Sequence, residues 1–325
     1  MTKRQIKKKA LITGIAGFAG SYLAEYLLEK KYKIYGFLAP GEKTDNIKHL
    51  KNNLNLERFN ILNENKVENF IKKVKPEYIF HLAAFSSVGQ SYKNEKLTID
   101  VNFDGTLNIL KAAASLITPL KKIIFISSPD IYGQFKPAGK TLKENQPFNP
   151  VSPYAVSKIA AEYLCRFYSL HHKLPIVRIR PFNHTGPRQT TNFVVPSFCK
   201  QIAEMEKSGK KVTMLVGDLS NKRDLSDVRD IVRGYYLLSE KGLSGEVYHL
   251  CTGRAASIRE VLNKLLKMAT VEIKVKEDIS RFRKSDIPIL RGDYKKAKKA
   301  VGWSPEYKLE QILLDTLDFW RNRIK

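Results

Sequence analysis

The stretch Thr13-Gly14-Ile15-Ala16-Gly17-Phe18-Ala19-Gly20, close to the N-terminus, decides the fold of this chain. Its glycines have the G-x-x-G-x-x-G spacing, and they lie between an apolar run at 8–13 and an amphipathic segment at 20–30. A strand, a glycine-rich turn and a helix in this order hold a dinucleotide pyrophosphate. Gly14 permits the tight turn, Gly17 lets the backbone approach the phosphates, and Gly20 lets the helix pack closely on the strand. The helix N-terminus then offers N–H groups and a favourable dipole to the phosphates.

Predicted strands and helices alternate along the chain after this turn. Strands are expected at 8–13, 33–38, 57–62, 78–83, 122–128 and 175–180, and helices at 20–30, 65–74, 98–115 and 151–171. Such alternation predicts an α/β fold with a doubly wound, parallel Rossmann sheet. A helix at 194–207 and a strand at 211–216 break the rhythm. We therefore predict a dinucleotide-binding domain over 1–184, to which 227–251 returns, and a smaller α/β substrate-binding lobe made of 185–226 and 252–325.

Composition narrows the class of protein further. The 325 residues are 43% hydrophobic and 27% charged, which is typical of a soluble globular protein. No apolar run approaches the roughly 20 residues of a membrane helix, so no membrane partner is expected. The three cysteines have no metal-binding or redox spacing, which predicts no metal site and fits the reduced cytoplasm. The net charge of +25 comes from lysines spread along the chain, which disfavours a nucleic-acid partner.

A second motif, Tyr154-Ala155-Val156-Ser157-Lys158, places a phenol and an ammonium on one face of a helix. Ser128 ends the preceding predicted strand, at the edge where ligands of such sheets bind. When hydride reaches a carbonyl carbon, the oxygen gains charge and a tyrosine can donate its proton. A nearby lysine favours the phenolate and thus lowers the tyrosine pKa. We therefore predict Ser128, Tyr154 and Lys158 as catalytic residues of a nicotinamide-dependent oxidoreductase.

The end of the second predicted strand bears on the choice of nicotinamide cofactor. The stretch Gly36-Phe37-Leu38-Ala39-Pro40-Gly41-Glu42-Lys43 has no acid at the strand tip to bind the ribose diol of NAD. Lys43 or Lys48 can meet a 2′-phosphate instead. The pattern favours NADP(H), while Glu42 leaves NAD(H) open.

Further motifs give the chain a family resemblance over essentially its full length. They are His81-Leu82-Ala83-Ala84, Asn102 with Gly105-Thr106, Ser127-Ser128 with Tyr132-Gly133, Ser152-Pro153-Tyr154 and Arg180-Pro181-Phe182-Asn183-His184. With them the chain resembles extended short-chain dehydrogenases/reductases of the NAD-dependent epimerase/dehydratase family, which act on nucleotide sugars. Later runs resemble GDP-6-deoxy-D-mannose reductases: Thr185-Gly186-Pro187, Arg223-Asp224, Asp227-Val228-Arg229-Asp230, Gly245-Glu246-Val247-Tyr248, Asp286-Ile287-Pro288 and Gly302-Trp303. Sister GDP-mannose 4,6-dehydratases share part of this pattern.

The resemblance implies roles by position. Beside the three glycines, Tyr154 and Lys158, the residues expected to bind the cofactor are Phe18, Ala19, Asn60, Ile61, Leu82, Ala83, Ala84, Phe182 and His184. Those expected to bind substrate are Ser86, Ser128, Asp130, Asn183, Arg223, Arg283 and Asp286. Arg223 and Arg283 match arginines that clamp a diphosphate, as planar bidentate donors do. Asn60 replaces the family's usual acid, and Arg188 stands where glycine is common.

The resemblance leaves the reaction type open between two sister activities. It favours NAD(P)H-dependent reduction of the C4 keto group of GDP-4-dehydro-6-deoxy-D-mannose, giving GDP-D-rhamnose. A GDP-mannose 4,6-dehydratase, or another NDP-sugar epimerase or dehydratase, is the alternative, because Asp130 stands where dehydratases carry a proton-abstracting glutamate. A sensor or nucleic-acid-binding member of the superfamily is the non-enzyme alternative, and such members usually lose the Tyr/Lys pair that this chain keeps.

Helix patterning predicts a self-association surface. In the predicted helix 151–171 the apolar side chains spread over too much of the circumference to face one sheet: Ala155, Ile159, Leu164, Phe167 and Tyr168. The resemblance implies a homodimer in which this helix and 98–115 form a four-helix interface with their copies, including Phe167 or Leu164.

Overall fold

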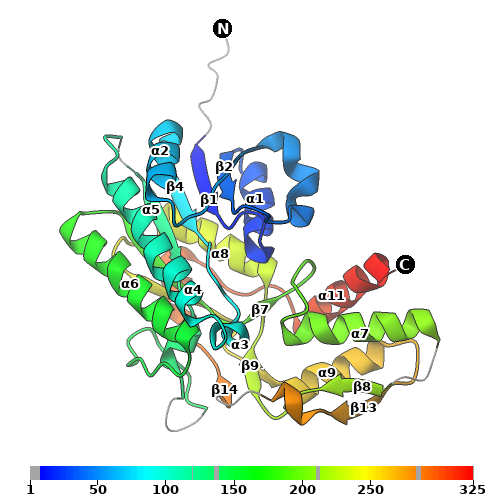
Figure 1. Ribbon diagram of the computed structural model, residues 1–325. Coiled ribbons are helices and arrows are strands. Elements are labelled where there is room, and N and C mark those ends of the chain that lie inside the picture. Colours follow the sequence, from blue (N-terminus) through cyan, green and yellow to red (C-terminus); the bar gives the residue numbers. More distant parts are fainter. Residues whose placement is uncertain (1–7, 119, 135–138, 210–212, 283–286, 325) are drawn as a thin grey trace.

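The computed structural model describes residues 8–118, 120–134, 139–209, 213–282 and 287–324. Within these ranges seven parallel strands form one sheet, in the order β11-β6-β5-β4-β1-β2-β3 (Figure 1). The strands are β1 (Lys9–Thr13), β2 (Lys33–Leu38), β3 (Leu54–Arg58), β4 (Tyr78–His81), β5 (Lys122–Ile126), β6 (Ile176–Pro181) and β11 (Val247–Leu250). The order reverses direction beside β1, and in doubly wound sheets ligands bind at such a switch point.

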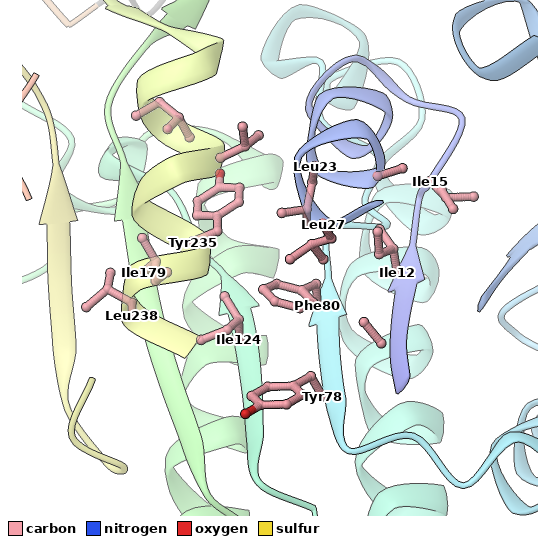
Figure 2. Packing of buried hydrophobic residues seen from close by; sticks show 14 of the residues in the cluster. Ile12, Ile15, Leu23, Leu27, Tyr78, Phe80, Ile124, Ile179, Tyr235 and Leu238 are labelled. Carbon is pink, nitrogen blue, oxygen red and sulfur yellow. The ribbon is translucent and has the colours of Figure 1, made fainter. Parts of the chain in front are cut away.

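Helices cover both faces of this sheet. One face carries α1 (Phe18–Glu29) and α8 (Val228–Lys241), and the other carries α2 (Glu64–Val74), α5 (Gly105–Ala114) and α6 (Pro153–His171). Side chains alternate along each strand, so Ala10 and Ile12 pack under α1 while Leu11 faces the opposite layer. Figure 2 shows the first layer, where side chains of α1, α8 and three strands meet: Leu23, Leu27, Tyr235, Leu238, Phe80, Ile124 and Ile179. The predicted doubly wound Rossmann fold is confirmed.

Two predicted elements differ from the observed ones. The third strand ends at Arg58, although its apolar pattern was expected to continue to position 62. Phe59 and Ile61 are buried beyond the strand end, where they close the core under α2 and α5. The predicted helix 98–115 is divided into α4 (Glu95–Ile99), a π-helical turn η2 (Asp100–Asp104) and α5. Such π turns often occur at functional sites.

A second group of elements gathers at one side of the molecule (Figure 1). Three helices share an apolar core with β8 (Thr213–Val216): α7 (Val194–Ser208), α9 (Ile258–Met268) and α11 (Leu309–Ile324). The exposed strand β13 (Lys274–Glu277) pairs with β8 in parallel. Beside them β9 (Lys222–Asp224) pairs with β12 (Ala255–Ser257) and β14 (Ile289–Leu290). Trp303 and α10 (Lys295–Val301) instead pack in the core layer of α1 and α8.

Short elements connect these layers. They are η1 (Asp45–Asn53), α3 (Val88–Ser91), η3 (Pro129–Tyr132), η4 (Ile279–Arg281) and the pair β7 (His184–Thr185) and β10 (Ser226–Asp227). In the part of the chain that the structure describes, no helix combines the length and apolarity that crossing a membrane requires.

We expect Gly20→Ala to destabilise the protein, because the new Cβ would lie 2.1 Å from the carbonyl oxygen of Gly14. The backbone of the glycine-rich turn would have to move, and overpacking of this kind costs about 1–3 kcal/mol. Thermal unfolding of the purified variant measures the effect. Gly89→Ala is the matched control, because no atom lies within 4 Å of its added Cβ. Equal unfolding temperatures for the two variants would contradict this account of the turn.

Candidate active site

A single elongated cavity of about 920 Å³ brings the predicted site residues together. Every predicted residue that the structure describes lines it: Gly14, Gly17, Phe18, Ala19, Gly20, Asn60, Ile61, Leu82, Ala83, Ala84, Ser86, Ser128, Asp130, Tyr154, Lys158, Phe182, Asn183, His184 and Arg223. Arg283 and Asp286 lie outside the described residues. The volume is at the upper end of the range for small-molecule sites, which suits long ligands.

The glycine-rich turn forms a narrow cradle at one end of this cavity. Gly14 has φ +69°, and a Cβ there would meet the backbone nitrogen of Ala83 at 2.9 Å. The Gly17 N–H donates to the Gly14 carbonyl at 3.1 Å, and α1 begins at the next residue. The N-cap Gly17 has no side chain to occupy the first-turn amides of α1. This cradle therefore has the shape and polarity that a dinucleotide pyrophosphate requires.

Aromatic side chains form the wall next to the cradle. The rings of Phe37 and Phe59 stack with centroids 4.3 Å apart, and both line the cavity. Asn60, which replaces the family's usual acid, accepts a hydrogen bond from the Leu62 N–H at 3.0 Å through its side-chain oxygen. Sequence reasoning missed Phe37 and Phe59, although two aromatic residues near the ends of neighbouring strands are a usable signal for a planar ligand.

The predicted catalytic residues lie where β5 and α6 approach each other. Ser128 donates to Oδ2 of Asp130 at 2.9 Å and accepts from the Asp130 N–H at 3.2 Å. The α6 helix begins with Pro153 after Ser152, whose hydroxyl accepts from the Ala155 N–H. Tyr154 and Lys158 therefore occupy its first two turns on one face, and both are buried. These contacts suit a proton donor held beside a hydrogen-bonding hydroxyl.

Burial shifts the pKa of both members of this pair. Burial raises the pKa of Tyr154, the charge of Asp130 raises it further, and only the Ser128 hydrogen bond lowers it. Burial lowers the pKa of Lys158 to about 8. Desolvation is the largest cause of both shifts, and Lys158 is not among the causes of the Tyr154 shift. Tyr154 is consequently a neutral phenol near pH 7, the form that donates a proton. That Lys158 and an oxidised nicotinamide together favour the phenolate stays a prediction.

A directed chain of hydrogen bonds joins β1 to α5 beside the site. Thr106 donates its hydroxyl hydrogen to the Asn102 carbonyl at 2.6 Å, so Nε2 of His81 must donate to Thr106 at 2.9 Å. Nδ1 of His81 then accepts from the Thr13 hydroxyl at 2.8 Å, and Thr13 accepts from the Ala83 N–H. Burial lowers the pKa of His81 to about 3, which keeps the imidazole neutral. The cofactor-facing strand ends are thereby fixed to α5.

Asn102 extends this chain to the catalytic helix. Its amide group donates to Ser157 Oγ at 2.8 Å and accepts from the Phe85 N–H at 2.7 Å. Ser157 in turn donates to the Tyr154 carbonyl at 2.7 Å. Asn102 lies in the π turn η2, which moves its side chain out of the regular helical register. The interruption of the predicted helix therefore has a positioning role beside Tyr154.

The far end of the cavity is polar and partly cationic. Ser127 and Asn183, which also line the cavity, have buried side-chain oxygens without a hydrogen-bond partner among the described residues. Arg223 donates to the Ile287 carbonyl at 2.6 Å and lines this end together with Arg281 of η4. Sequence reasoning missed Arg281 because it lies 58 positions after Arg223 and no spacing links the two. Buried oxygens and guanidinium groups in one pocket suit a hydroxyl-rich, anionic ligand.

Among the described residues, no group of three or more His, Cys, Asp or Glu side chains is placed to hold a metal ion. The side chains that line the cavity include a phenol, an ammonium, hydroxyls, carboxylates and guanidinium groups. A glycine cradle, a Tyr-Lys helix and a cationic pocket on one Rossmann sheet define a dinucleotide-dependent enzyme of the extended short-chain dehydrogenase/reductase class.

Comparison with known proteins gives the family within this class. The family model of GDP-mannose 4,6 dehydratase matches residues 11–316, so the chain belongs to that family. GDP-6-deoxy-D-mannose reductase of Pseudomonas aeruginosa is 31% identical over 318 residues, which cover 98% of this chain and 99% of the relative. The resemblance deduced from the motifs is confirmed.

Two solved structures share the whole fold. RMD from Pseudomonas aeruginosa complexed with NADPH superposes with a TM-score of 0.83 at 30% identity, covering 98% of this chain and all of that one. UDP-glucuronic acid 4-epimerase from Bacillus cereus, in complex with UDP-glucuronic acid and NAD, has a TM-score of 0.87 at 28% identity, covering 97% and 99%. The complete architecture is thus that of nucleotide-sugar enzymes with a nicotinamide cofactor.

We expect Lys158→Met to stabilise the folded protein at pH 7 while it abolishes turnover. Burial lowers the Lys158 pKa from 10.5 to about 8, so the folded state disfavours the ammonium. The resulting loss in the free energy of unfolding is fully present below pH 8. It disappears as the pH rises from 8 to 10.5, because the folded protein then holds the neutral amine. The gain at pH 7 should be about 1–3 kcal/mol.

Chemical unfolding at pH 7 and pH 10 measures this gain for both proteins. The difference between them should shrink at the higher pH. Lys267→Met, at an exposed position of α9, is the control and should change little at either pH. A Lys158→Met variant that is less stable at pH 7 would show that the ammonium contributes to folding.

Proposed function

We propose that this protein reduces the C4 keto group of GDP-4-dehydro-6-deoxy-D-mannose to GDP-D-rhamnose with a nicotinamide dinucleotide as hydride donor. One observation carries the proposal: the glycine cradle, the Tyr154–Lys158 pair and Arg223 line the same cavity. The match to GDP-6-deoxy-D-mannose reductase over nearly the full length of both chains supports this sugar nucleotide. The domain formed by 1–184 and 227–251 would bind the dinucleotide, and 185–226 with 252–325 would bind the sugar nucleotide.

The residues near Tyr154 fit a reduction in which the chain supplies the proton. A bound nicotinamide would supply the hydride. Tyr154, whose raised pKa keeps it protonated, donates its proton to the C4 oxygen. The Ser128 hydroxyl donates to Asp130 in this structure and would turn to the same C4 oxygen when substrate binds. Lys158 lies one turn further along α6 and stabilises the phenolate that remains. This sequence of steps is typical of general acid catalysis with a neutral acid near pH 7.

The opposite end of the cavity supports binding of the nucleotide diphosphate. Arg223 is held by its bond to the Ile287 carbonyl, and Arg281 donates to the Leu215 carbonyl at 3.1 Å. Arg281 also pairs with Asp278 at 3.3 Å. Planar guanidinium groups held at one pocket wall suit phosphate oxygens. The buried oxygens of Asn183 and Ser127 would accept sugar hydroxyls. Roles for Arg283 in the clamp and Asp286 at the ribose stay predictions from the family pattern.

For the cofactor we favour NADP(H), with NAD(H) as the alternative. RMD from Pseudomonas aeruginosa, which shares the fold, has been solved with NADPH, whereas the Bacillus cereus epimerase has been solved with NAD. We also propose a cytoplasmic location. The three cysteines are free and buried in the described structure, which suits a reducing compartment.

Dehydration of GDP-mannose is the second candidate activity. The carboxylate of Asp130 lines the cavity two residues after Ser128, near the position where a dehydratase needs a base. Its bond from Ser128 engages Oδ2, and the preceding Pro129 offers no side-chain acceptor. The family model also bears the dehydratase name. The reductase is preferred because the Pseudomonas aeruginosa reductase matches at 31% identity over 99% of its length, against 29% and 91% for GDP-mannose 4,6 dehydratase of Cricetulus griseus.

A direct assay distinguishes the two reactions. With GDP-4-dehydro-6-deoxy-D-mannose and NADPH, a reductase oxidises one cofactor molecule for each sugar reduced, so absorbance at the nicotinamide band falls in step with product seen by mass spectrometry. A dehydratase converts GDP-mannose with no net absorbance change. Observing only the second reaction would reverse the assignment.

Tyr154→Phe tests the proton donor in the same assay. Turnover should fall roughly 10²-fold or more, as losses of general acids do, while the cofactor still binds. Tyr163→Phe is the control on the same helix, since Tyr163 lies on the outer face of α6 and is half exposed. If Tyr154→Phe turned over substrate at nearly the wild-type rate, Tyr154 would not be the proton donor.

We further propose a homodimer through the outer face of α6. Its half-exposed apolar side chains follow one helical stripe, with exposed fractions near one half: Val156, Tyr163, Phe167 and Leu170. The neighbouring α4 adds Leu97 and Ile99, and the two helices lie side by side on one flank (Figure 1). Leu164 packs inward against the core instead, so Phe167 is the better interface candidate. A stripe of this kind on both copies is typical of a four-helix interface.

Light scattering tests this assembly. The wild type should have twice the 37.2 kDa chain mass at micromolar concentration, and Phe167→Glu should shift it to the monomer because a charge would be buried in an apolar interface. Leu243→Glu is the control, at an exposed apolar residue beyond the end of α8. A wild type that is monomeric at these concentrations would contradict the proposal.

A further inference from the structure

The tip of β2 holds a carboxylate that its sequence position does not indicate. The strand ends at Leu38, and the acid comes only four residues later, at Glu42. The chain turns back, and Oε2 of Glu42 accepts a hydrogen bond from the Ala39 N–H at 2.8 Å. Glu42 and Ala39 both line the main cavity. The loop after β2 therefore places the Glu42 carboxylate at the end of this strand, where an acid of the strand itself is missing.

An arginine from the neighbouring strand lies beside this carboxylate. Arg58 is the last residue of β3 and is paired in register with Leu38 at the end of β2. Its Nη1 donates to the carbonyls of Ala39 at 3.4 Å and Glu42 at 3.3 Å. Both bonds are long, and Arg58 forms no ion pair within the described part of the chain, since its neighbour Glu57 is taken by Lys73 at 2.8 Å. Arg58 thus retains charge and donors for an anion.

Glu42 and Arg58 face the place where the two nicotinamide cofactors differ. In this fold the tip of the second strand meets the ribose of adenosine, which carries a 2′-hydroxyl in NAD and a 2′-phosphate in NADP. Glu42 lines the main cavity and also a shallow surface hollow next to it, whose wall includes Arg58 and Lys43. Lys48, the other sequence candidate, lines neither. A group projecting from the ribose would therefore pass Glu42 and reach Arg58.

We propose that Arg58 and Glu42 together set the preference of this enzyme between NADP(H) and NAD(H). The guanidinium of Arg58 binds the 2′-phosphate through its planar set of donors. The carboxylate of Glu42 binds the free diol of NAD(H) and repels the phosphate. This assignment rests on the proposed dinucleotide site. It replaces Lys48 with Arg58, a residue from a different strand, and leaves Lys43 beside it in the hollow.

Direct binding measurements test the assignment without any assay of turnover. Fluorescence titration of the full chain with NADPH and with NADH gives a dissociation constant for each. In Arg58→Ala the constant for NADPH should rise about 10-fold or more, the loss expected for a charge-assisted hydrogen bond, whereas that for NADH should change less than about 2-fold. Glu42→Gln keeps an acceptor for the Ala39 N–H, so it should tighten NADPH and weaken NADH. Lys48→Ala is the matched control and should leave both unchanged.

Two outcomes overturn the proposal: equal weakening of both cofactors by Arg58→Ala, or unchanged NADPH affinity in that variant. Thermal unfolding shows whether each variant is folded, and Arg58→Gln replaces Arg58→Ala if the alanine variant is not. A second measurement uses the wild type alone, in which adenosine 2′,5′-bisphosphate should compete with NADPH more strongly than 5′-AMP. If the wild type bound neither dinucleotide, the proposed function itself would be contradicted. This result differs from the two above, which contradict only the roles of Arg58 and Glu42.

Discussion

The buried ion pair between Glu162 of α6 and Arg180 of β6 fixes the catalytic helix on the sheet. It is bidentate, with Nε to Oε2 at 3.0 Å and Nη2 to Oε1 at 2.5 Å, and both side chains are almost fully buried. Burying two charges costs desolvation energy, so the remaining donors of Arg180 must also be satisfied. They bind the Tyr132 hydroxyl and the Glu144 carbonyl. Because Lys158 lies one turn before Glu162, this pair determines which face of α6 enters the cavity.

Burial of the Lys158 ammonium lowers the stability of the folded protein, and packing elsewhere in the fold offsets this loss. Lys158 is buried without an ion pair in the described structure, and its ammonium lies over the Phe125 ring, 4.7 Å from the ring centre. A buried, unpaired ammonium opposes folding. Function explains its retention, because the ammonium is placed where a phenolate forms during proton donation. Packing of the two apolar layers around the sheet stabilises the fold enough to offset this destabilising burial.

Local features were predictable from sequence, and features that depend on distant segments were not. The glycine turn and the Tyr154–Lys158 spacing are short patterns whose geometry is set within one turn and one helix. The end of β3 was placed too late because Phe59 and Ile61 continue an apolar alternation, although their burial comes from packing under α2. The positions of Arg281 and Arg58 in the site arise only when chain reversal brings separate strands together. No spacing in the sequence encodes that proximity.

The position of Asp130 links the choice of reaction to the electrostatics of the site. Its carboxylate raises the Tyr154 pKa and so favours the protonated phenol, which is the starting form for reduction. A dehydratase first removes hydrogen from C4, for which the phenolate is the useful form, and it also needs a free carboxylate near C5. In this structure the Ser128 hydroxyl donates to that carboxylate and accepts from the Asp130 N–H, so the two residues are held together on the proton-donor side of the cavity. The same short contacts therefore oppose dehydration and support proton donation.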